Sequence, residues 1–343
     1  MSRYLKVRKI EMSKYKIAIV NSSSFGKIFP DQLERLGKLG EVNRLTIDSE
    51  IGGKELAEAL HGYNVIVASV TPFFTREFFE HKDETQLITR HGIGYNNIDI
   101  EAAKEYNTLV SIVPPLIERD AVAENNITNL LAVMRQTVPA NNAVKDDKWE
   151  NRNHFVGHGL SGKKVGVIGI GNIGSRVVEI LNYGFRCQVL GYDPNISDLE
   201  IEQFGAIPTA LDDLLENAEV ICLSPSLNDD NYHMISTEEF KKMRDDVYIS
   251  NTARGALIDE EAMVQALKDG KVAGFATDVL EVEPGRKDHP YLDFDNVIVT
   301  PHTAAYTMEC IKGMGETCVT DVENLVVGKL PNRAVQAVSK FIK

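Results

Sequence analysis

The segment 164–182 places three glycines between a strand-like run and a helix-like run. It reads KVGVIGIGNIGSRVVEILN, with the strand-like run at 165–168. The spacing GxGxxG alone is a weak signal, but a strand before it and a helix after it are the setting in which it binds a dinucleotide. Gly169 suits a tight turn, Gly171 a close approach to a pyrophosphate, and Gly174 the packing of helix on strand. The segment therefore predicts a nucleotide site at the end of a parallel strand.

The next strand-like run ends in a carboxylate. CQVLGYDP places Asp193 nineteen residues after Gly174. At this offset a carboxylate can accept hydrogen bonds from the adenosine ribose hydroxyls, and it would repel a 2′-phosphate. Alone, Asp193 would be a turn residue before Pro194. The glycines ahead of it favour the ribose role, and therefore NAD over NADP.

Short β-branched runs alternate with helix-like segments in two parts of the chain, 16–112 and 164–302. Between them stand Pro114 and Pro115, followed by a long helix predicted over 118–138 from the spacing of its apolar residues. Strands and helices that alternate in this way are typical of parallel sheets covered by helices. We therefore expect an α/β protein with two doubly wound parallel-sheet domains.

The composition limits what the chain binds. Its 343 residues, 43% hydrophobic and 25% charged, suit about two globular domains. A net charge of -13 disfavours nucleic acid and anionic membrane surfaces as partners. The four cysteines form no CxxC pair and no apolar run reaches about 18 residues, so we expect buried thiols, no metal site, no membrane span and a cytoplasmic location. We assign no function to the residues before Met12.

Polar side chains stand at or just after the ends of three later strand-like runs. VYISNTARG carries Arg254, GFATDVLEVEP carries Asp278 and Glu283, and NVIVTPH carries His302. Ligands of an open parallel sheet bind beyond the carboxyl ends of its strands, so we expect these residues near the nicotinamide end of the nucleotide site. Taken singly, the charged residues could be solvated and the histidine could be a loop residue. Asp278, inside an apolar run, needs a partner, and the combination favours a site.

An arginine, a glutamate and a histidine together suit the chemistry of a 2-oxo acid. Arg254 can hold the carboxylate with its fork-shaped guanidinium and polarise the neighbouring carbonyl. His302 can give a proton to the carbonyl oxygen as hydride reaches the carbon, and Glu283 beside it would favour the imidazolium. We therefore hypothesise an NAD-dependent reductase of small 2-oxo acids.

The motifs that carry these residues resemble those of the D-isomer-specific 2-hydroxyacid dehydrogenases. The resemblance extends from about Lys16 to Gln336, and its motifs are RHGIGYNNID, VAE, VGVIGIGNIG, NTARGALID, ATDVLEVEP and VTPHTAAYT. It implies a Rossmann NAD-binding domain inserted into a flavodoxin-like substrate domain. On this basis we expect the substrate domain at 1–112 and 305–343, and the NAD-binding domain at 113–304.

The resemblance also implies roles for individual residues. Arg254 would orient the substrate, and His302 would act as general acid and base with Glu283 as its partner. Asp278 would bind the nicotinamide carboxamide. The residues expected to bind substrate are Ile93 and Gly94, through backbone amides, and Tyr306. Those expected to bind the cofactor are Gly169, Gly171, Asn172, Ile173, Gly174, Asp193, Pro225, Thr252, Ala253 and Asp278. Members of the family are usually dimers built on the helix that contains VAE, so we expect a homodimer.

The family has branches that differ in substrate, and this chain combines features of more than one branch. Ala68 stands where the phosphoglycerate branch has a phosphate-binding arginine, which disfavours phosphoglycerate. HTAAYT resembles the D-lactate and D-hydroxyisocaproate branch, whereas RHGIGYNNID is one residue longer than the usual loop of that branch. Phe73 and Phe74 either line an apolar pocket or belong to the core. Lactate, branched-chain 2-hydroxy acids and glycerate stay open.

Two other functions are compatible with the fold. The family resemblance extends to NADH-responsive corepressors, which can retain the catalytic residues, so a binding protein is the alternative to an enzyme. A Rossmann enzyme with non-redox chemistry is a third possibility, because a fold alone does not fix a function. The spacing of Arg254, Glu283 and His302 after the glycines argues against it.

Overall fold

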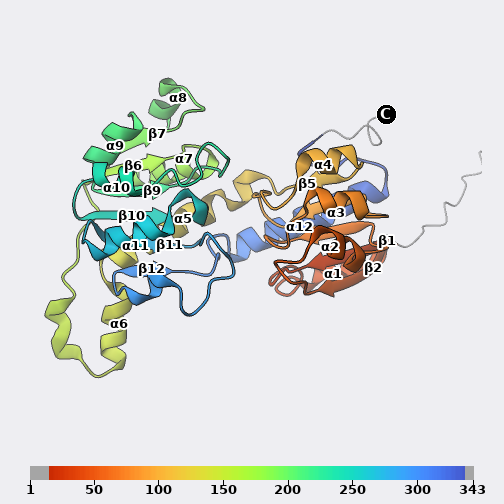
Figure 1. Ribbon diagram of the computed structural model, residues 1–343, viewed down its shortest axis with the longest axis horizontal. Coiled ribbons are helices and arrows are strands. Elements are labelled where there is room, and N and C mark those ends of the chain that lie inside the picture. The colour runs from red at the N-terminus through yellow and green to blue at the C-terminus, as the bar shows by residue number, and fades with distance from the viewer. Residues whose placement is uncertain (1–14, 337–343) are drawn as a thin grey trace, which may run out of the picture. The chain divides into compact units, whose positions relative to one another are not determined.

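The structure, a computed structural model, describes residues 15–336 (Figure 1). It divides the chain into two compact units. Unit 1 comprises the chain up to Ile117 and from Ile311 onward, and unit 2 comprises Glu118–Cys310. The segment before Met12 lies outside the described residues.

Both divisions fall inside long helices. α5 spans Pro115–Met134 and α12 spans Met308–Val326. The sequence suggested bounds after residues 112 and 304, which precede these helices. The first turn of α5 belongs to unit 1 because Ile117 packs against α12, where a Cβ on Gly313 would lie 2.8 Å from its side chain.

Unit 1 contains a five-stranded parallel sheet in the order β2-β1-β3-β4-β5, which is the flavodoxin-like order. Its strands are β1 (Tyr15–Val20), β2 (Gly40–Leu45), β3 (Val65–Ala68), β4 (Leu87–Arg90) and β5 (Leu109–Ser111). Its shorter helices are α1 (Pro30–Leu39), α2 (Gly53–Ala59), α3 (Arg76–His81) and α4 (Ile100–Glu105). Successive residues of β1 enter two different apolar clusters, Ile17 and Ile19 in one, Ala18 and Val20 in the other. Both faces of the sheet are therefore covered, which explains the unbroken apolar runs.

Unit 2 contains a seven-stranded parallel sheet in the order β12-β11-β10-β9-β6-β7-β8. Its strands are β6 (Lys164–Ile168), β7 (Gln188–Tyr192), β8 (Ile207–Pro208), β9 (Val220–Leu223), β10 (Val247–Asn251), β11 (Val272–Thr277) and β12 (Val297–Val299). The chain runs outward from β6 to β8 and then returns to β9 on the other side of β6. The strand order thus reverses between β6 and β9, which is where open sheets of this kind bind ligands.

Helices cover both faces of the unit 2 sheet. α9, α10 and α11 supply Leu214, Phe240 and Met263 to one apolar cluster, whereas α5 and α7 supply Ile127 and Val177 to the other. Besides α5, the helices are α6 (Thr137–Lys145), η1 (Trp149–His154), α7 (Asn172–Glu179), η2 (Ile180–Gly184), α8 (Asp198–Gln203), α9 (Leu211–Asn217), α10 (Thr237–Lys242), η3 (Gly255–Leu257), α11 (Glu260–Lys268) and η4 (Pro290–Asp293). The predicted α/β class with two doubly wound parallel sheets is confirmed.

The helix predicted over 118–138 is wrong in its extent. α5 ends at Met134, and Gln136 has a left-handed backbone with φ of 51°. A second helix, α6, follows, and with η1 it forms an arm, residues 137–156, that extends from the body of unit 2 in Figure 1. The break has a local cause, because a left-handed residue cannot continue a right-handed helix.

Phe73 and Phe74 have different environments. The Phe74 side chain is fully buried and its ring meets that of Phe78 edge to face, with centroids 5.0 Å apart. Phe73 is 49% exposed. Of the two alternatives, Phe74 is therefore a core residue of unit 1, and Phe73 is a surface residue.

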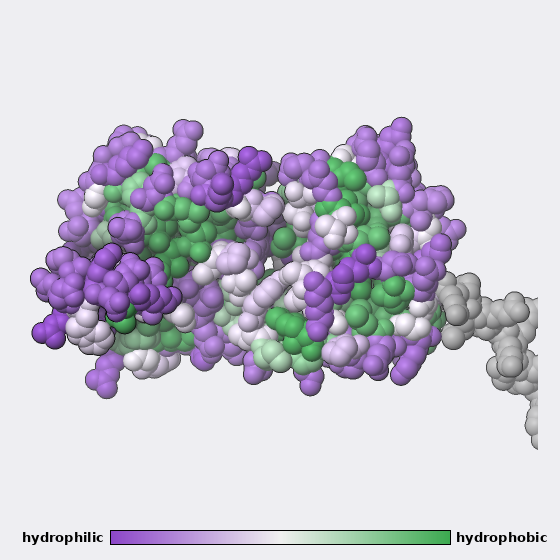
Figure 2. Space-filling model, turned by 90° about the horizontal axis from the view of Figure 1, so that it is seen from below, coloured by the Kyte–Doolittle hydropathy of each residue, from purple (hydrophilic) through white to green (hydrophobic). Residues whose placement is uncertain are grey.

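All four cysteines are free and buried, as predicted. Burial raises the pKa of Cys310 and of Cys318 to about 12, so these thiols are poor nucleophiles. Among residues 15–336, no helix combines the length and apolarity that a bilayer crossing requires. The face drawn in Figure 2 shows both hydrophilic and apolar areas on each unit.

Candidate active site in unit 2

The glycine loop after β6 is shaped by contacts between backbone atoms. Gly169 has φ of +83°, and a Cβ there would overlap Pro225. A Cβ on Gly174 would overlap the carbonyl oxygen of Gly169, because α7 passes directly over the turn. Gly171 is different: a Cβ there would have no protein atom within 4 Å. Two glycines therefore allow the fold, and the third leaves space beside the start of α7, which has Asn172 as its first residue.

Asp193 follows β7 and contacts this loop. Its Oδ2 accepts a hydrogen bond from the backbone N–H of Ile170 at 2.8 Å, and its Oδ1 accepts one from Asn195 at 2.9 Å. Each carboxylate oxygen has further lone pairs for other donors. The carboxylate is thus fixed beside the turn of the glycine loop, where the sequence suggested a ribose-binding residue.

The neighbouring strands place the other expected cofactor residues at the same end of the sheet. Pro225 comes two residues after β9 and packs on Gly169. Thr252 directly follows β10, and its hydroxyl accepts a hydrogen bond from Asn126 of α5 at 3.1 Å. The backbone N–H of Ala253 donates to Asn251 at 3.0 Å. The residues present fit a dinucleotide, because the open space at Gly171, the amides of α7 and the Asp193 carboxylate lie along one edge.

Asp278 organises the turn after β12. Its carboxylate accepts hydrogen bonds from the Thr300 hydroxyl, from the backbone N–H of Thr303 at 2.9 Å and from that of Ala304 at 2.7 Å. Its carbonyl oxygen accepts one from the N–H of His302 at 2.9 Å. Burial raises the pKa of Asp278, although these donors oppose the rise. The partner that this buried carboxylate needs is therefore the turn that carries His302.

His302 and Glu283 form a close pair. His302 Nδ1 lies 2.7 Å from Glu283 Oε2, and both side chains are partly buried. Burial by itself would raise the pKa of Glu283, but the hydrogen bond and charge of His302, with the Leu280 N–H and Arg254, bring that pKa below its usual value. His302 has φ of 53°, a left-handed conformation that is rare for a residue with a side chain. Strained backbones of this kind occur where surrounding contacts impose them.

Arg254 follows β10, and its charge interacts with the carboxylates of Glu283 and Glu118. Burial lowers the pKa of its guanidinium, while the carboxylates of Glu283 and Glu118 act in the opposite direction. Its side chain also donates to the carbonyl oxygen of Ala253 at 2.6 Å, and its own carbonyl accepts from Asn251 at 2.9 Å. The structure therefore brings the expected Arg254, Glu283 and His302 together in unit 2.

Some contributors to this region were missed in the sequence. Glu118, in the first turn of α5, is a buried carboxylate whose charge reaches Arg254. Thr300 connects Asp278 to Asn129 of α5, which donates to the Thr300 hydroxyl at 3.2 Å. The only available signal was position, because Thr300 stands immediately before the Pro-His motif and Glu118 a few residues before VAE.

The expected substrate residues are divided between the two units. Ile93 and Gly94 lie in unit 1, in the loop after β4, and Tyr306 lies in unit 2, where its N–H donates to Thr303 at 2.8 Å. The same unit 1 loop contains a second histidine, His91. Burial, followed by the charge of Arg90, lowers the pKa of His91 to about 3, so this imidazole is neutral and unsuited to acid catalysis at neutral pH.

Comparison with known proteins agrees with this geometry. Residues 127–304 match the family model described as D-isomer specific 2-hydroxyacid dehydrogenase, NAD binding domain. A D-3-phosphoglycerate dehydrogenase from Methanocaldococcus jannaschii is 35% identical over 87% of this chain and 56% of its own length. A glyoxylate reductase from Thermofilum pendens is 32% identical over 81% of this chain and 83% of its own length.

A solved structure gives the same result. The D-lactate dehydrogenase from Aquifex aeolicus, complexed with NAD and lactic acid, aligns with a TM-score of 0.82 and 27% identity, covering 94% of this chain and all of that one. The chain spans about half the length of the phosphoglycerate dehydrogenases that it matches. The chain belongs to the D-isomer specific 2-hydroxyacid dehydrogenase family, and the part matched in unit 2 is its NAD-binding domain.

Proposed function

We propose that this chain catalyses the NAD-dependent interconversion of a small 2-oxo acid and its D-2-hydroxy acid. The observation that carries the proposal is the 2.7 Å contact between His302 Nδ1 and Glu283 Oε2, in the region reached by the charge of Arg254. A carboxylate that holds the Nδ1 side of an imidazole orients the ring and leaves Nε2 to exchange a proton with a substrate. Family membership supports the same reaction class.

In the direction of reduction, two protein groups act on the substrate oxygens. Arg254 binds the substrate carboxylate and polarises the adjacent carbonyl, since its guanidinium stays charged. His302 donates its Nε2 proton to the carbonyl oxygen as that oxygen gains negative charge, and Glu283 stabilises the imidazolium beforehand. In the reverse direction the neutral His302 accepts the hydroxyl proton.

The cofactor, when bound, supplies or accepts the hydride. We assign its pyrophosphate to the amides of Asn172 and Ile173 at the start of α7, in the space beside Gly171. Asp193 binds the ribose hydroxyls and disfavours a 2′-phosphate. Asp278 binds the nicotinamide carboxamide through the lone pairs that the turn after β12 does not use. Pro225, Thr252 and Ala253 line the site from the strands next to β6.

For the substrate we propose a small 2-oxo acid without a phosphate group. Ala68, fully buried at the end of β3, offers no charge to a phosphate. Tyr306, 46% exposed just after the His302 turn, contacts the substrate side chain. In unit 1, the backbone amides of Ile93 and Gly94 bind the substrate carboxylate. The roles toward the carboxylate and the carbonyl apply equally to glyoxylate, pyruvate and branched-chain 2-oxo acids. The Tyr306 contact applies only to acids with a side chain, because glyoxylate carries hydrogen at that position.

We also propose that two copies of the chain form a dimer through α5 and the arm. Neither α6 nor η1 buries any of its residues. Trp149 is 69% exposed, and Val144 and Val156 are likewise exposed. Large exposed apolar side chains on a projecting segment are typical of an interface. Sedimentation velocity of the wild type and of Trp149→Ser tests this proposal, because the variant should lower the dimer fraction, and a monomeric wild type would contradict it.

A panel of 2-oxo acids at fixed NADH tests the proposed activity. Glyoxylate, pyruvate, 2-oxoisocaproate, hydroxypyruvate and 3-phosphohydroxypyruvate are offered separately, and NADH oxidation is followed by absorbance. We expect turnover of at least one acid without a phosphate, and turnover at least about a hundredfold slower by Arg254→Ala or His302→Ala. NADH binding without turnover of any acid would reject the enzyme and favour a cofactor-sensing protein. Turnover of 3-phosphohydroxypyruvate alone would reject the proposed substrate class.

A further inference from the structure

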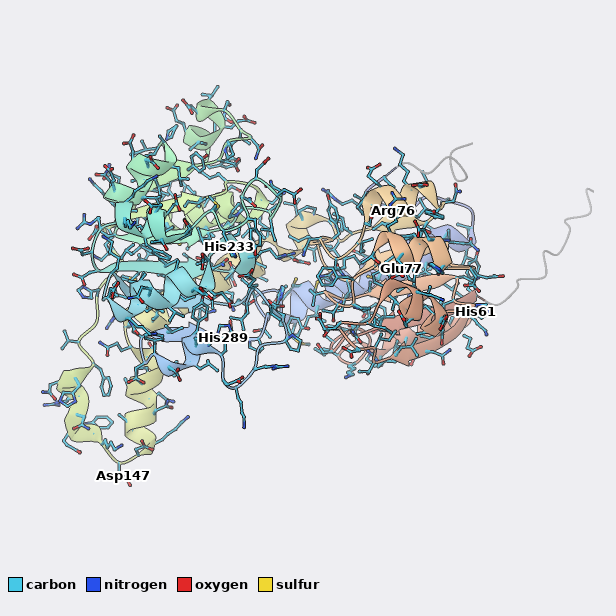
Figure 3. The ribbon with its side chains drawn as sticks, in the orientation of Figure 1. His61, Arg76, Glu77, Asp147, His233 and His289 are labelled. Carbon is cyan, nitrogen blue, oxygen red and sulfur yellow. The ribbon has the colours of Figure 1, made fainter. Side chains whose placement is uncertain are left out.

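Two adjacent residues with aromatic rings contact a second carboxylate, Glu281, in the turn after β11. The Tyr232 hydroxyl donates to Glu281 Oε1 at 2.7 Å, and His233 Nε2 lies 3.0 Å from Glu281 Oε2. The rings of Tyr232 and His233 are stacked, with centroids 4.0 Å apart. We call Tyr232, His233 and Glu281 the clasp. Figure 3 labels His233, which lies in unit 2.

The clasp acts on the turn that also carries Glu283. Glu281 and Glu283 are two residues apart, and Glu283 Oε1 accepts the backbone N–H of Leu280 at 3.1 Å. The N–H of Glu281 donates to Glu260 of α11 at 3.0 Å, and Glu260 Oε2 lies 3.3 Å from His289 Nε2. Glu281 is thus held through both its side chain and its backbone, two residues before Glu283.

The clasp also adjoins the segment that follows Arg254. The N–H of His233 donates to the carbonyl oxygen of Ala256 at 2.8 Å. A Cβ on Gly255 would overlap the peptide that joins Leu280 to Glu281, so these backbones touch without a side chain between them. The segments after β9, β10 and β11 therefore pack on one another at the clasp.

The backbone conformation of His233 indicates that neighbouring contacts hold this residue in place. Its φ of 51° is left-handed, as is that of His302, and such a conformation persists only when neighbouring contacts hold it. The Asp259 carboxylate also faces the imidazole, with its Oδ2 at 3.9 Å from Nδ1. The base of the same loop, Pro225, packs on Gly169 of the glycine loop. The segment after β9 is therefore held at Pro225 by the glycine loop and at His233 by the turn after β11. Only the His233 end lies next to the turn that carries Glu283.

We propose that Glu281, held by Tyr232 and His233, is a positioning residue that fixes the turn carrying Glu283 and thereby the orientation of the His302 imidazole. The inference rests on the proposed function for its kinetic consequence. Its structural consequence, the state of the hydrogen bond between His302 and Glu283, does not depend on turnover.

The kinetic test compares Glu281→Gln, His233→Ala, His233→Gln and the wild type. Misplacement of a catalytic group by about 1 Å can cost on the order of 10² in rate, so we expect kcat to fall about tenfold to a hundredfold for the first two. KM for NADH should stay within about twofold, because the glycine loop end of the segment is unaffected. His233→Gln should recover part of kcat, since its amide can still donate to Glu281. Asp212→Asn, which breaks an exposed 2.8 Å pair with Lys242, should leave kcat unchanged.

The spectroscopic test follows the downfield proton resonance of His302 Nδ1–H, identified by its absence in His302→Ala. We expect Glu281→Gln and His233→Ala to shift or broaden it and Asp212→Asn to leave it in place. If the resonance and kcat both match the wild type in the two clasp variants, or if only the melting temperature changes, the inference is overturned. If the wild type reduces no 2-oxo acid but the resonance still moves in the two clasp variants, the proposed function is wrong. The positioning role of Glu281 is then retained.

Discussion

The glycine loop after β6 and the turn after β12 place their functional groups by different means. In the glycine loop, backbone touches backbone: a side chain on Gly174 would overlap the Gly169 carbonyl. In the turn after β12, side chains distant in sequence hold the backbone: the Asp278 carboxylate accepts hydrogen bonds from Thr300, Thr303 and Ala304, and Glu283 contacts His302. One region depends on the absence of side chains and the other on a polar network.

The difference has a consequence for how each region fails. A loop fixed by close backbone approach is sensitive to added volume, because an overlap forces the chain to move. A turn fixed by hydrogen bonds is sensitive to the loss of one partner, because a buried polar group is then left without a donor or acceptor. Substitutions in the glycine loop should therefore affect cofactor affinity and fold stability. Substitutions in the turn after β12 should affect the catalytic rate most strongly.

Among the substitutions that test this comparison, the largest effect is expected in the polar region, from Arg254→Gln. Loss of a preorganised charge that acts on the substrate oxygens should lower kcat/KM by about 10² to 10³. Affinity for NADH, measured by fluorescence titration, should change little. Arg244→Gln, at an exposed arginine, is the control and should retain activity. Wild-type kcat/KM in Arg254→Gln would remove this residue from the site.

Two alanine substitutions in the glycine loop sharpen the contrast. Gly174→Ala introduces the overlap with Gly169 and should lower the free energy of unfolding by about 1–3 kcal/mol. Gly171→Ala meets no protein atom and should leave that free energy within about 0.5 kcal/mol. Its methyl group takes the space assigned to the pyrophosphate, so its Kd for NADH should rise about tenfold. Denaturant unfolding and NADH titration measure the two quantities, and normal NADH affinity in Gly171→Ala would contradict the assigned pyrophosphate position.

An effect of similar size is expected from Asp193→Ala. Removal of a charged acceptor should weaken NADH binding by about 1.5–3 kcal/mol and weaken NADPH binding less, so that the preference for NADH narrows. The ratio of kcat/KM for the two cofactors measures this preference. Asp198→Ala, at an exposed aspartate of α8, should leave the ratio as it is in the wild type. An unchanged ratio in Asp193→Ala would reject the ribose role.

The smallest effect concerns pH and stability. The pKa of Glu283 is below its usual value in the folded chain, so its ionised pair with His302 stabilises the fold above the pKa that a glutamate has when unfolded. This contribution is lost as pH falls through the folded pKa. The difference in free energy of unfolding between the wild type and Glu283→Gln should therefore be present at neutral pH and shrink in acid. Glu202→Gln, at an exposed position, is the control; a difference that grows in acid would contradict the pair.

The difference between the glycine loop and the turn after β12 also explains which parts of the site could be predicted from the sequence. The glycine loop and Asp193 follow from spacing, because the backbone constraint requires glycine itself and acts over a short stretch of chain. The alternation of apolar runs predicts both sheets for a similar reason. The residues of the turn after β12 were predicted from their places at strand ends and from the family motifs. The hydrogen bonds that hold this turn could not be predicted, since its partners Asp278 and Glu283 come from another strand end.

Other features have no local signature. The left-handed residue Gln136, which ends α5 early, belongs to no turn-forming type. Glu118 and the clasp of Tyr232, His233 and Glu281 depend on contacts between segments that only the folded chain brings together. Glu118 and the clasp residues are of types that are common at protein surfaces, so only their neighbours in the folded chain reveal their contacts.

The most direct test of the central claim is the rate of NADH oxidation by His302→Ala with a 2-oxo acid that the wild type reduces. The claim is that His302, held by Glu283, supplies the proton to the substrate. It predicts a fall in kcat of about 10² to 10⁴, the usual contribution of a general acid, with NADH affinity unchanged. A kcat close to that of the wild type would show that the proton comes from another group and would contradict the proposed mechanism.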